Sequence, residues 1–366
     1  MSRPVFIIGA GCSRENAEYL GSLGVPCLTT WQGIDRLAED CESFCGRPGV
    51  IGMRAANVIN QKAETLYVFG ARLDQSQVNY NYEKFAPHAR KIVYDIDLAE
   101  LEKFPDDWET HHVDLQKPFE LAIAPDKDWM RWCKDLYKRF RYELEGCETK
   151  DDFVDSYVFV KQLSEVCQEG EIIIPASSGQ QSCALMQAFK VKRGQRILLC
   201  NTIGAMGFEP MAIGAAIATG KRVVMISGDG GFFINIQELE TVKRLDLNIK
   251  YFVFDNQGYA SVTIMQDARF GLRVGADAGS GLTFPDLKKL AAVWDFPFYD
   301  LENNSQLDRL KEILAAEGAS ITRIKFTLDF HPAGKVMATL KDNVFVNDDL
   351  SDLSPKIADL ERIMRE

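Results

Sequence analysis

The apolar patterning around residues 222–254 constrains the fold of this chain more than any other feature. Residues 222–227 and 249–254 are short and almost continuously apolar, which is the pattern of strands buried on both faces of a sheet. Between them, residues 232–246 carry apolar side chains at helical spacing. A strand, a helix and a second strand in this order form a right-handed crossover, in which the two strands are parallel and end at the same edge of the sheet.

Polar motifs follow both strands at that edge. The first strand leads into Gly-Asp-Gly-Gly at 228–231, and the second leads into Asn-Gln-Gly at 256–258. Asp229 and Asn256 should therefore meet where open α/β sheets bind ligands. Their side-chain oxygens, with the backbone carbonyl of Gly258, form a set of hard oxygen ligands suited to Mg²⁺. The alternative for the first motif is a purely structural glycine turn, and the matched second motif argues against it.

The glycines of the first motif add an anion-binding feature. Gly230 and Gly231 open the predicted helix, so their N–H groups and the positive end of the helix dipole should face the metal. Proteins usually hold Mg²⁺ with one or two side chains and leave its other positions to phosphate oxygens. The sequence therefore predicts a ligand that carries a diphosphate.

These motifs resemble the thiamine diphosphate motif of acetolactate synthase and its relatives, in which Gly-Asp-Gly is followed after this interval by Asn. Residues 204–208, Gly-Ala-Met-Gly-Phe, resemble the family segment whose Met supports the bent cofactor and whose backbone binds the aminopyrimidine. Residues 178–181, after a predicted strand at 172–175, resemble the segment that holds the diphosphate. Gln181 replaces the family's His there, and its amide is still a hydrogen-bond donor.

Carried over residue by residue, the resemblance implies the composition of the whole site. Asp229, Asn256 and Gly258 are the expected metal ligands. Residues around the substrate are expected at Ser261, Val262 and Met265, with Met265 near the place of a Trp found in true acetolactate synthases. Without that Trp, a 2-oxo acid decarboxylase or a carboligase with another acceptor is as good an expectation as acetolactate formation. The expected cofactor contacts are Ser178, Gly179, Gln180, Gln181, Gly204, Met206, Gly228, Asp229, Gly230, Gly231, Asn256, Gly258, Tyr259 and Ala260.

The first part of the chain resembles the family's middle domain, so the expected fold class is α/β with two doubly wound parallel-sheet domains. We expect the middle domain at 1–125, a connecting helix within 126–151, and the diphosphate- and Mg²⁺-binding domain with a C-terminal tail at 152–366. In acetolactate synthases, the counterparts of residues 70–72 and 95–97 contact FAD. A flavin is therefore a possible second cofactor, although a purely structural domain is the stronger expectation.

Full-length relatives begin with a further α/β domain whose Glu protonates the pyrimidine nitrogen of the cofactor. No segment of this sequence resembles that domain. The resemblance therefore implies a separate pyrimidine-binding subunit that supplies the activating Glu, and no catalytic residue is assigned on this chain. Because relatives share the cofactor between subunits, a homo-oligomer is also expected.

Composition limits the remaining classes. With 42 Lys and Arg against 53 Asp and Glu, the net charge of −11 disfavours nucleic acid as a partner. The sequence has no apolar run long enough to span a membrane. The nine Cys are scattered without a Cys-x-x-Cys motif, which favours reduced thiols and a cytoplasmic location.

Three functions remain open from the sequence. The first is the cofactor-binding subunit of a thiamine diphosphate-dependent lyase or transferase acting on a small 2-oxo acid. The second is a protein that binds the cofactor without catalysis. The third is a flavin or nicotinamide oxidoreductase, suggested by glycine turns such as Gly9 to Gly11, which lack the third glycine of a dinucleotide fingerprint.

Overall fold

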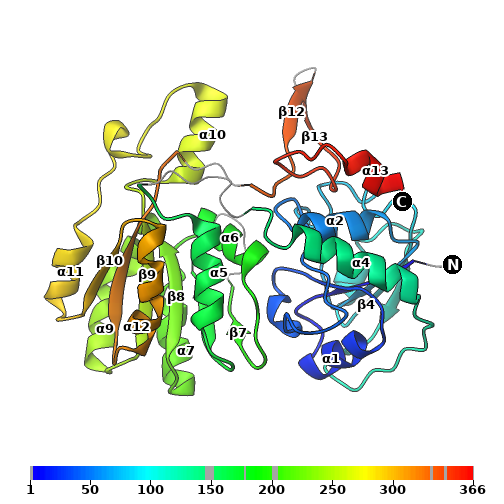
Figure 1. Cartoon of the computed structure of the whole chain (residues 1–366), viewed down its shortest axis with the longest axis horizontal. Helices are drawn as coiled ribbons and strands as arrows, with labels where there is room; N and C mark the ends of the chain where they lie inside the picture. Colours follow the sequence, from blue (N-terminus) through cyan, green and yellow to red (C-terminus); the bar gives the residue numbers. More distant parts are fainter. Residues whose placement is uncertain are drawn as a thin grey trace. The chain divides into compact units, whose positions relative to one another are not determined.

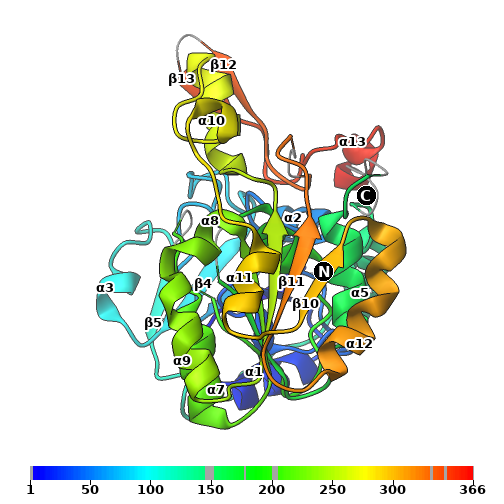
Figure 2. The same cartoon turned by 90° about the vertical axis from the view of Figure 1, so that its left-hand side faces the viewer.

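The computed structural model describes residues 3–144, 152–176, 179–199, 205–329, 333–341 and 344–365. It divides into two compact units, Met1–Leu144 with Ala333–Glu366, and Glu145–Pro332. Each unit contains a parallel sheet covered by helices (Figures 1 and 2). The predicted fold class, α/β with two doubly wound parallel-sheet domains, is confirmed.

The first unit contains a five-stranded sheet in the order β2-β1-β3-β4-β5, with all neighbouring strands parallel. Its strands are β1 (Pro4–Ile8), β2 (Cys27–Thr29), β3 (Thr65–Phe69), β4 (Arg90–Asp95) and β5 (Glu109–His112). Its helical segments are α1 (Arg14–Ser22), η1 (Ile34–Arg36), α2 (Arg54–Gln61), α3 (Leu98–Leu101) and α4 (Lys127–Phe140). The order of strands reverses direction between β1 and β3, which is where such sheets offer a ligand crevice.

In the first unit, the glycine turns after β1 and β3 pack directly against each other. Gly11 N–H donates to the Gly70 carbonyl at 2.9 Å, and Gly9 N–H donates to the Phe69 carbonyl at 2.8 Å. A Cβ on Gly9 would lie 2.2 Å from the Gly70 carbonyl oxygen. The two glycine turns that the sequence singled out therefore contact each other, and the absence of a side chain at Gly9 is a packing requirement.

The second unit contains a six-stranded parallel sheet in the order β10-β11-β9-β8-β6-β7. Helices α5 and α12 lie on one face, and α7 and α9 lie on the other (Figure 2). The strands are β6 (Ile172–Pro175), β7 (Arg196–Ile197), β8 (Val223–Gly228), β9 (Ile249–Asp255), β10 (Phe298–Leu301) and β11 (Ser320–Lys325). The α-helices are α5 (Ser156–Val166), α6 (Gln180–Ala188), α7 (Pro210–Thr219), α8 (Asp229–Phe232), α9 (Leu239–Arg244), α10 (Ala260–Phe270), α11 (Leu287–Val293) and α12 (Leu310–Ala315). Three 3₁₀ segments complete the unit, namely η2 (Phe233–Glu238), η3 (Ala278–Ser280) and η4 (Asn304–Arg309).

The single helix predicted for residues 232–246 is wrong in one respect, because the chain is not continuously helical. The short helix α8 passes into η2, and α9 begins only after it. The break lies at Asn235, whose backbone angles (φ −122°, ψ 37°) are not helical. Asn235 also donates its side-chain amide to the Gly207 carbonyl at 2.9 Å. Periodicity alone could not show this break, because the residue that accepts the hydrogen bond from Asn235 lies 28 positions earlier in the chain.

The C-terminal tail, Ala333–Glu366, belongs to the first unit. The sequence had placed it with the second domain, at 152–366. Arg54, fully buried on α2, donates to the carbonyls of Leu353 and Pro355, the former at 3.1 Å. Asn57 on the same helix donates to the Leu350 carbonyl at 2.7 Å. Buried donors must find acceptors, and the tail supplies them.

The tail contains regular secondary structure. Strands β12 (Ala338–Lys341) and β13 (Val344–Asn347) form an antiparallel pair, and α13 (Leu360–Arg365) follows. Elsewhere, no helix in the described part of the chain is long and apolar enough to span a bilayer.

The contact between the two glycine turns gives a stability prediction. Gly9→Ala should lower the free energy of unfolding by about 2 kcal/mol or more, because the new methyl group collides with rigid backbone. Gly214→Ala is the control, since Gly214 lies within α7 and an added Cβ there meets nothing within 4 Å. It should raise stability by about 0.5–1 kcal/mol through helix propensity. Chemical denaturation followed by circular dichroism checks both, and an unchanged midpoint for Gly9→Ala would contradict the packing.

Candidate functional site

Three strand ends come together at the carboxyl edge of the second sheet. Strands β6, β8 and β9 are adjacent, in the order β9-β8-β6. The chain after β6 is joined to β8 by a hydrogen bond from Ala176 N–H to the Ile226 carbonyl at 2.9 Å. The direction of strand order reverses between β6 and β8, so this edge is the ligand-binding position of a doubly wound sheet. The motifs at 179–181, 228–231 and 256–258 all follow these strands.

Asp229 connects the ends of β8 and β9 directly. Its side chain is buried, at 2% relative exposure. Oδ2 accepts hydrogen bonds from the backbone N–H groups of Asn256 at 3.1 Å and Gln257 at 2.7 Å. Oδ1 accepts from Gly230 N–H at 2.7 Å. The two motifs therefore meet as predicted, because the Asp229 carboxylate of the first motif accepts hydrogen bonds from the backbone of the second.

The pKa of Asp229 is raised to about 7, mainly by burial and to a smaller extent by the nearby Asp255 carboxylate, while the three backbone donors oppose the shift. In the described part of the chain, no basic side chain forms an ion pair with Asp229. A buried carboxylate that lacks a positive partner is costly when it is ionised. A divalent cation at this position would supply the missing charge, so the residue fits a metal ligand.

The turn after β9 is shaped by backbone contacts. Gln257 adopts a left-handed conformation (φ 57°), which is strained for a residue with a side chain. Gly258 N–H donates to the Asn256 side-chain oxygen at 3.1 Å, and Tyr259 N–H donates to the Ala276 carbonyl at 2.8 Å. This turn holds the Asn256 amide oxygen and the Gly258 carbonyl on the short segment after the strand, as a pair of metal ligands requires.

The glycine turn after β8 is packed against the second motif. A Cβ on Gly230 would lie 2.0 Å from the ring of Tyr259, so only glycine fits there. Two parts of the sequence prediction need correction. The N–H of Gly230 is not free, because it donates to Asp229. Helix α8 also has only four residues, which weakens the expected contribution of a helix dipole.

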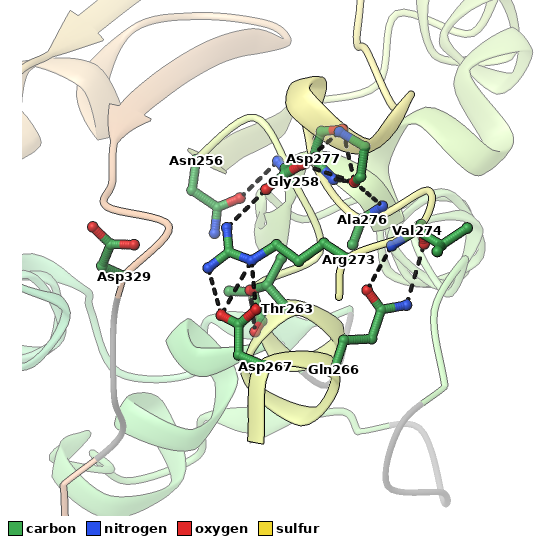
Figure 3. A network of polar contacts seen from close by, with 12 residues as sticks. Asn256, Gly258, Thr263, Gln266, Asp267, Arg273, Val274, Ala276, Asp277 and Asp329 are labelled. Atoms are coloured by element: carbon green, nitrogen blue, oxygen red, sulfur yellow. Dashed lines mark hydrogen bonds and ion pairs between the residues drawn. The ribbon is translucent and has the colours of Figure 1, made fainter. Parts of the chain in front are cut away.

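A polar network that the sequence did not reveal holds the loop after α10 against the turn that follows β9 (Figure 3). The guanidinium of Arg273 donates to Asp267 through Nε at 2.9 Å and through Nη2 at 2.6 Å. Its Nη1 donates to Asp277 at 2.7 Å. Gln266 exchanges two hydrogen bonds with the backbone of Val274. The network fixes the carbonyl of Ala276 that accepts from Tyr259, and so fixes the start of α10. The only sign of this network in the sequence is the spacing of Asp267, Arg273 and Asp277, which are six and four positions apart.

The residues expected around the substrate lie on α10. Ser261 and Met265 are exposed, Met265 at 39%, and Val262 is partly buried. Ala260, at the first position of the helix, is buried. The accessible side chains of α10 are available to a ligand or to another protein domain.

The remaining expected contacts are placed less completely. Ser178, Gly204 and the side chain of Gln180 lie outside the described residues. Gly179 is the N-cap of α6, and Gln181 is buried at 3% with its side-chain amide close to the Gly179 Cα. Met206 is 42% exposed, which is unusual for a thioether and leaves it able to contact a bound molecule.

The types of atom in the expected metal site limit which ion it suits. The described residues contain no group of three or more His, Cys, Asp or Glu side chains arranged to hold a metal. The expected set here consists of one carboxylate, one amide oxygen and one backbone carbonyl. Such a set leaves coordination positions for phosphate oxygens and waters, which is the arrangement that Mg²⁺ prefers.

Two family models match the chain. The thiamine pyrophosphate enzyme, C-terminal TPP binding domain, matches residues 177–324, and the thiamine pyrophosphate enzyme, central domain, matches residues 1–111. Thiamine pyrophosphate is the same compound as thiamine diphosphate. The first matched range contains all three strand-end motifs of the second sheet.

Several acetolactate synthases are similar in sequence. The acetolactate synthase isozyme 2 large subunit of Escherichia coli (strain K12) is 32% identical over 283 residues, covering 73% of this chain and 50% of the relative. The isozyme 1 large subunit of the same organism is 28% identical over 339 residues, covering 88% and 58%. Acetolactate synthase 2, chloroplastic, of Zea mays is 29% identical over 339 residues, covering 86% and 52%.

The chain thus spans about half the length of the curated relatives it matches. The matches extend over both sheets and include the turn in which Asp229 joins the two strand ends. The chain therefore belongs to the thiamine pyrophosphate enzymes, as an acetolactate synthase-like member that carries their central and C-terminal TPP-binding domains.

Proposed function

We propose that the chain is the cofactor-binding part of a thiamine diphosphate-dependent enzyme that decarboxylates a 2-oxo acid or joins it to a second carbonyl compound. The observation that carries this proposal is the buried carboxylate of Asp229, which joins two adjacent strand ends and has no basic partner in the described part of the chain. A Mg²⁺ ion held by Asp229, Asn256 and the Gly258 carbonyl would balance that charge.

The diphosphate would lie between the ends of β6 and β8. Gly179 is the N-cap of α6, and Gly228, Gly230 and Gly231 are the neighbours of Asp229 in the chain. These glycines let a ligand approach the backbone closely. Ser178, Gln180 and Gln181 are the further contacts proposed at this end. Thiamine diphosphate, when bound, supplies the electron sink for cleavage of the bond between the carbonyl and carboxylate carbons. The residues of this chain would bind and orient it.

The thiamine end would rest on the segment that contains Met206, just before α7. In this proposal Met206 supports the cofactor and backbone groups around Gly204 contact the aminopyrimidine. The exposure of Met206, at 42%, supports the role because a bound ring would cover it. Tyr259 and Ala260, at the start of α10, complete the cofactor contacts.

The substrate would lie beside α10, next to Ser261, Val262 and Met265. Their exposure supports this placement, and a small 2-oxo acid is the substrate class that the family relationship favours. With Met265 in place of a Trp, the acceptor is not fixed as the one that gives acetolactate. Both a lyase and a transferase are compatible with these side chains.

A partner is part of the proposal. The two matched family models are the central and the C-terminal TPP-binding domains, so we infer that the acid that activates the cofactor comes from a pyrimidine-binding domain outside residues 1–366, and we propose that a separate polypeptide supplies it. The assembly would be a cytoplasmic homo-oligomer that contains this domain. A non-catalytic cofactor-binding protein is the alternative, and it differs by showing no turnover with any partner.

A flavin on the first unit is the weakest element of the sequence interpretation. The turns after β1 and β3 contact each other through Gly11 and Gly70, and nothing in this contact favours a flavin over a structural role. An absorption spectrum of the purified protein tests for flavin directly. A flavin signal without affinity for thiamine diphosphate would favour an oxidoreductase instead.

The metal site gives the central prediction. Asp229→Ala should weaken the binding of thiamine diphosphate with Mg²⁺ by roughly 100-fold or more, because it removes the charged metal ligand. Calorimetry at fixed Mg²⁺ measures the affinity. Glu312→Ala, which removes an exposed carboxylate on α12, is the matched control and should bind like the wild type. Chelation with EDTA should reduce wild-type affinity to the level of Asp229→Ala. Equal affinity of wild type and Asp229→Ala would refute the metal site.

The thiamine end gives a second prediction. Met206→Ala should weaken thiamine diphosphate binding roughly tenfold, because it removes apolar contact with the ring. Ile217→Ala is the control, since Ile217 is an exposed apolar residue of the same unit, at 57%, on α7. Both variants should keep the wild-type melting temperature because neither side chain is buried. If Met206→Ala binds as tightly as Ile217→Ala, Met206 does not contact the cofactor.

The partner requirement gives a third prediction. The isolated chain with thiamine diphosphate and Mg²⁺ should release no CO₂ from pyruvate or a longer 2-oxo acid above the background rate, because the proposal places the activating acid on a separate pyrimidine-binding domain. Co-expression with a separately encoded pyrimidine-binding domain from the same cells should restore release. Rapid turnover by the isolated chain would show that no partner is needed, whereas the cofactor site would stand.

A further inference from the structure

The segment 205–209 is held in place by two side chains that flank the metal turn. Asn235, six residues after Asp229, donates to the Gly207 carbonyl at 2.9 Å. Ser227, two residues before Asp229, donates its hydroxyl to Glu209 Oε1 at 2.5 Å. The segment expected under the thiamine ring is therefore attached to both sides of the turn expected at the diphosphate.

Glu209 is an unusual residue for this position, because it is a buried acid without a basic partner. Its relative exposure is 5%, and its Oε2 has no hydrogen-bond partner among the described residues. It lines a small cavity of about 10 Å³ together with Asn235 and Tyr251, and no basic residue takes part in that lining. A cavity of this size holds about one water molecule.

The surroundings raise the pKa of Glu209. Burial is the main cause, and the hydrogen bond from Ser227 only partly opposes the shift. The titratable groups that face the cavity from other elements are Glu238 on η2 and Tyr251 on β9, and neither carries a positive charge that could pair with a carboxylate at Glu209. Oε1 of Glu209 accepts from Ser227, which leaves Oε2 able to bond a water in the cavity.

We propose that Glu209 is a positioning residue, which holds residues 205–208 against the end of β8 so that Met206 meets the thiamine end of the cofactor. Glu209 itself touches neither the metal nor the cofactor. This inference rests on the proposed function, because it concerns the same site. Glu209 would therefore affect how the ring end of the ligand is bound, whereas Asp229 would bind the metal at the diphosphate end.

Two variants and two ligands separate this role from general stability. Glu209→Ala removes the acceptor of Ser227, whereas Glu209→Gln keeps a carbonyl acceptor and a nearly equal volume. The ligands are thiamine diphosphate and inorganic pyrophosphate, each with Mg²⁺ and measured by calorimetry. Pyrophosphate contacts only the diphosphate end, so it reports on the metal turn alone.

Glu209→Ala should bind thiamine diphosphate roughly tenfold more weakly, the effect of one buried hydrogen bond, with unchanged affinity for pyrophosphate. Glu209→Gln should restore the affinity for thiamine diphosphate. If Glu209→Ala fails to fold, Ser227→Ala removes the same bond from the other side and should show the same difference between ligands.

Other outcomes overturn the inference. An unchanged affinity in Glu209→Ala, an equal loss for both ligands, or a folded Glu209→Gln that binds as weakly as Glu209→Ala would each show that Glu209 does not position the ring end. If the wild type binds neither ligand, the proposed function itself has failed, and Glu209 is not the cause.

Discussion

The buried carboxylate of Asp229 is the interaction on which the rest of this site depends. It accepts three backbone hydrogen bonds, two of them from the turn after β9, and therefore fixes the distance between two neighbouring strand ends. Burial makes its negative charge costly, and this cost is what a bound cation would relieve. The stability of the turn, and the affinity for the proposed metal, would thus depend on the same two oxygen atoms.

Close packing around this carboxylate explains why glycine recurs nearby. Tyr259 lies where a side chain on Gly230 would be, and the Ala276 carbonyl lies where a side chain on Gly258 would be. The loop that carries Ala276 is in turn held by Arg273 through Asp267 and Asp277. The start of α10, and with it the expected substrate side of the site, is therefore set by contacts that extend well beyond the motifs.

The two sheets share an architecture but differ at the position where ligands bind. In the first unit the turns after β1 and β3 pack against each other through Gly9, Gly11 and Gly70. In the second unit the corresponding edge carries a buried acid, an amide and a segment held by Asn235 and Glu209. The fold alone does not distinguish these cases. The difference arises from which side chains and carbonyls occupy the strand ends.

The sequence by itself determined the strands at 172–175, 222–227 and 249–254, the parallel course of the last two, and the meeting of Asp229 with Asn256, because apolar periodicity and crossover handedness are local rules. It determined neither the break at Asn235, nor the place of the tail on the first unit, nor the buried Glu209. Each of these depends on a partner far away in the chain: the Gly207 carbonyl for Asn235, Arg54 for the tail, and Ser227 for Glu209. Only tertiary packing brings such donors and acceptors together, since buried polar groups take whichever partners the folded chain provides.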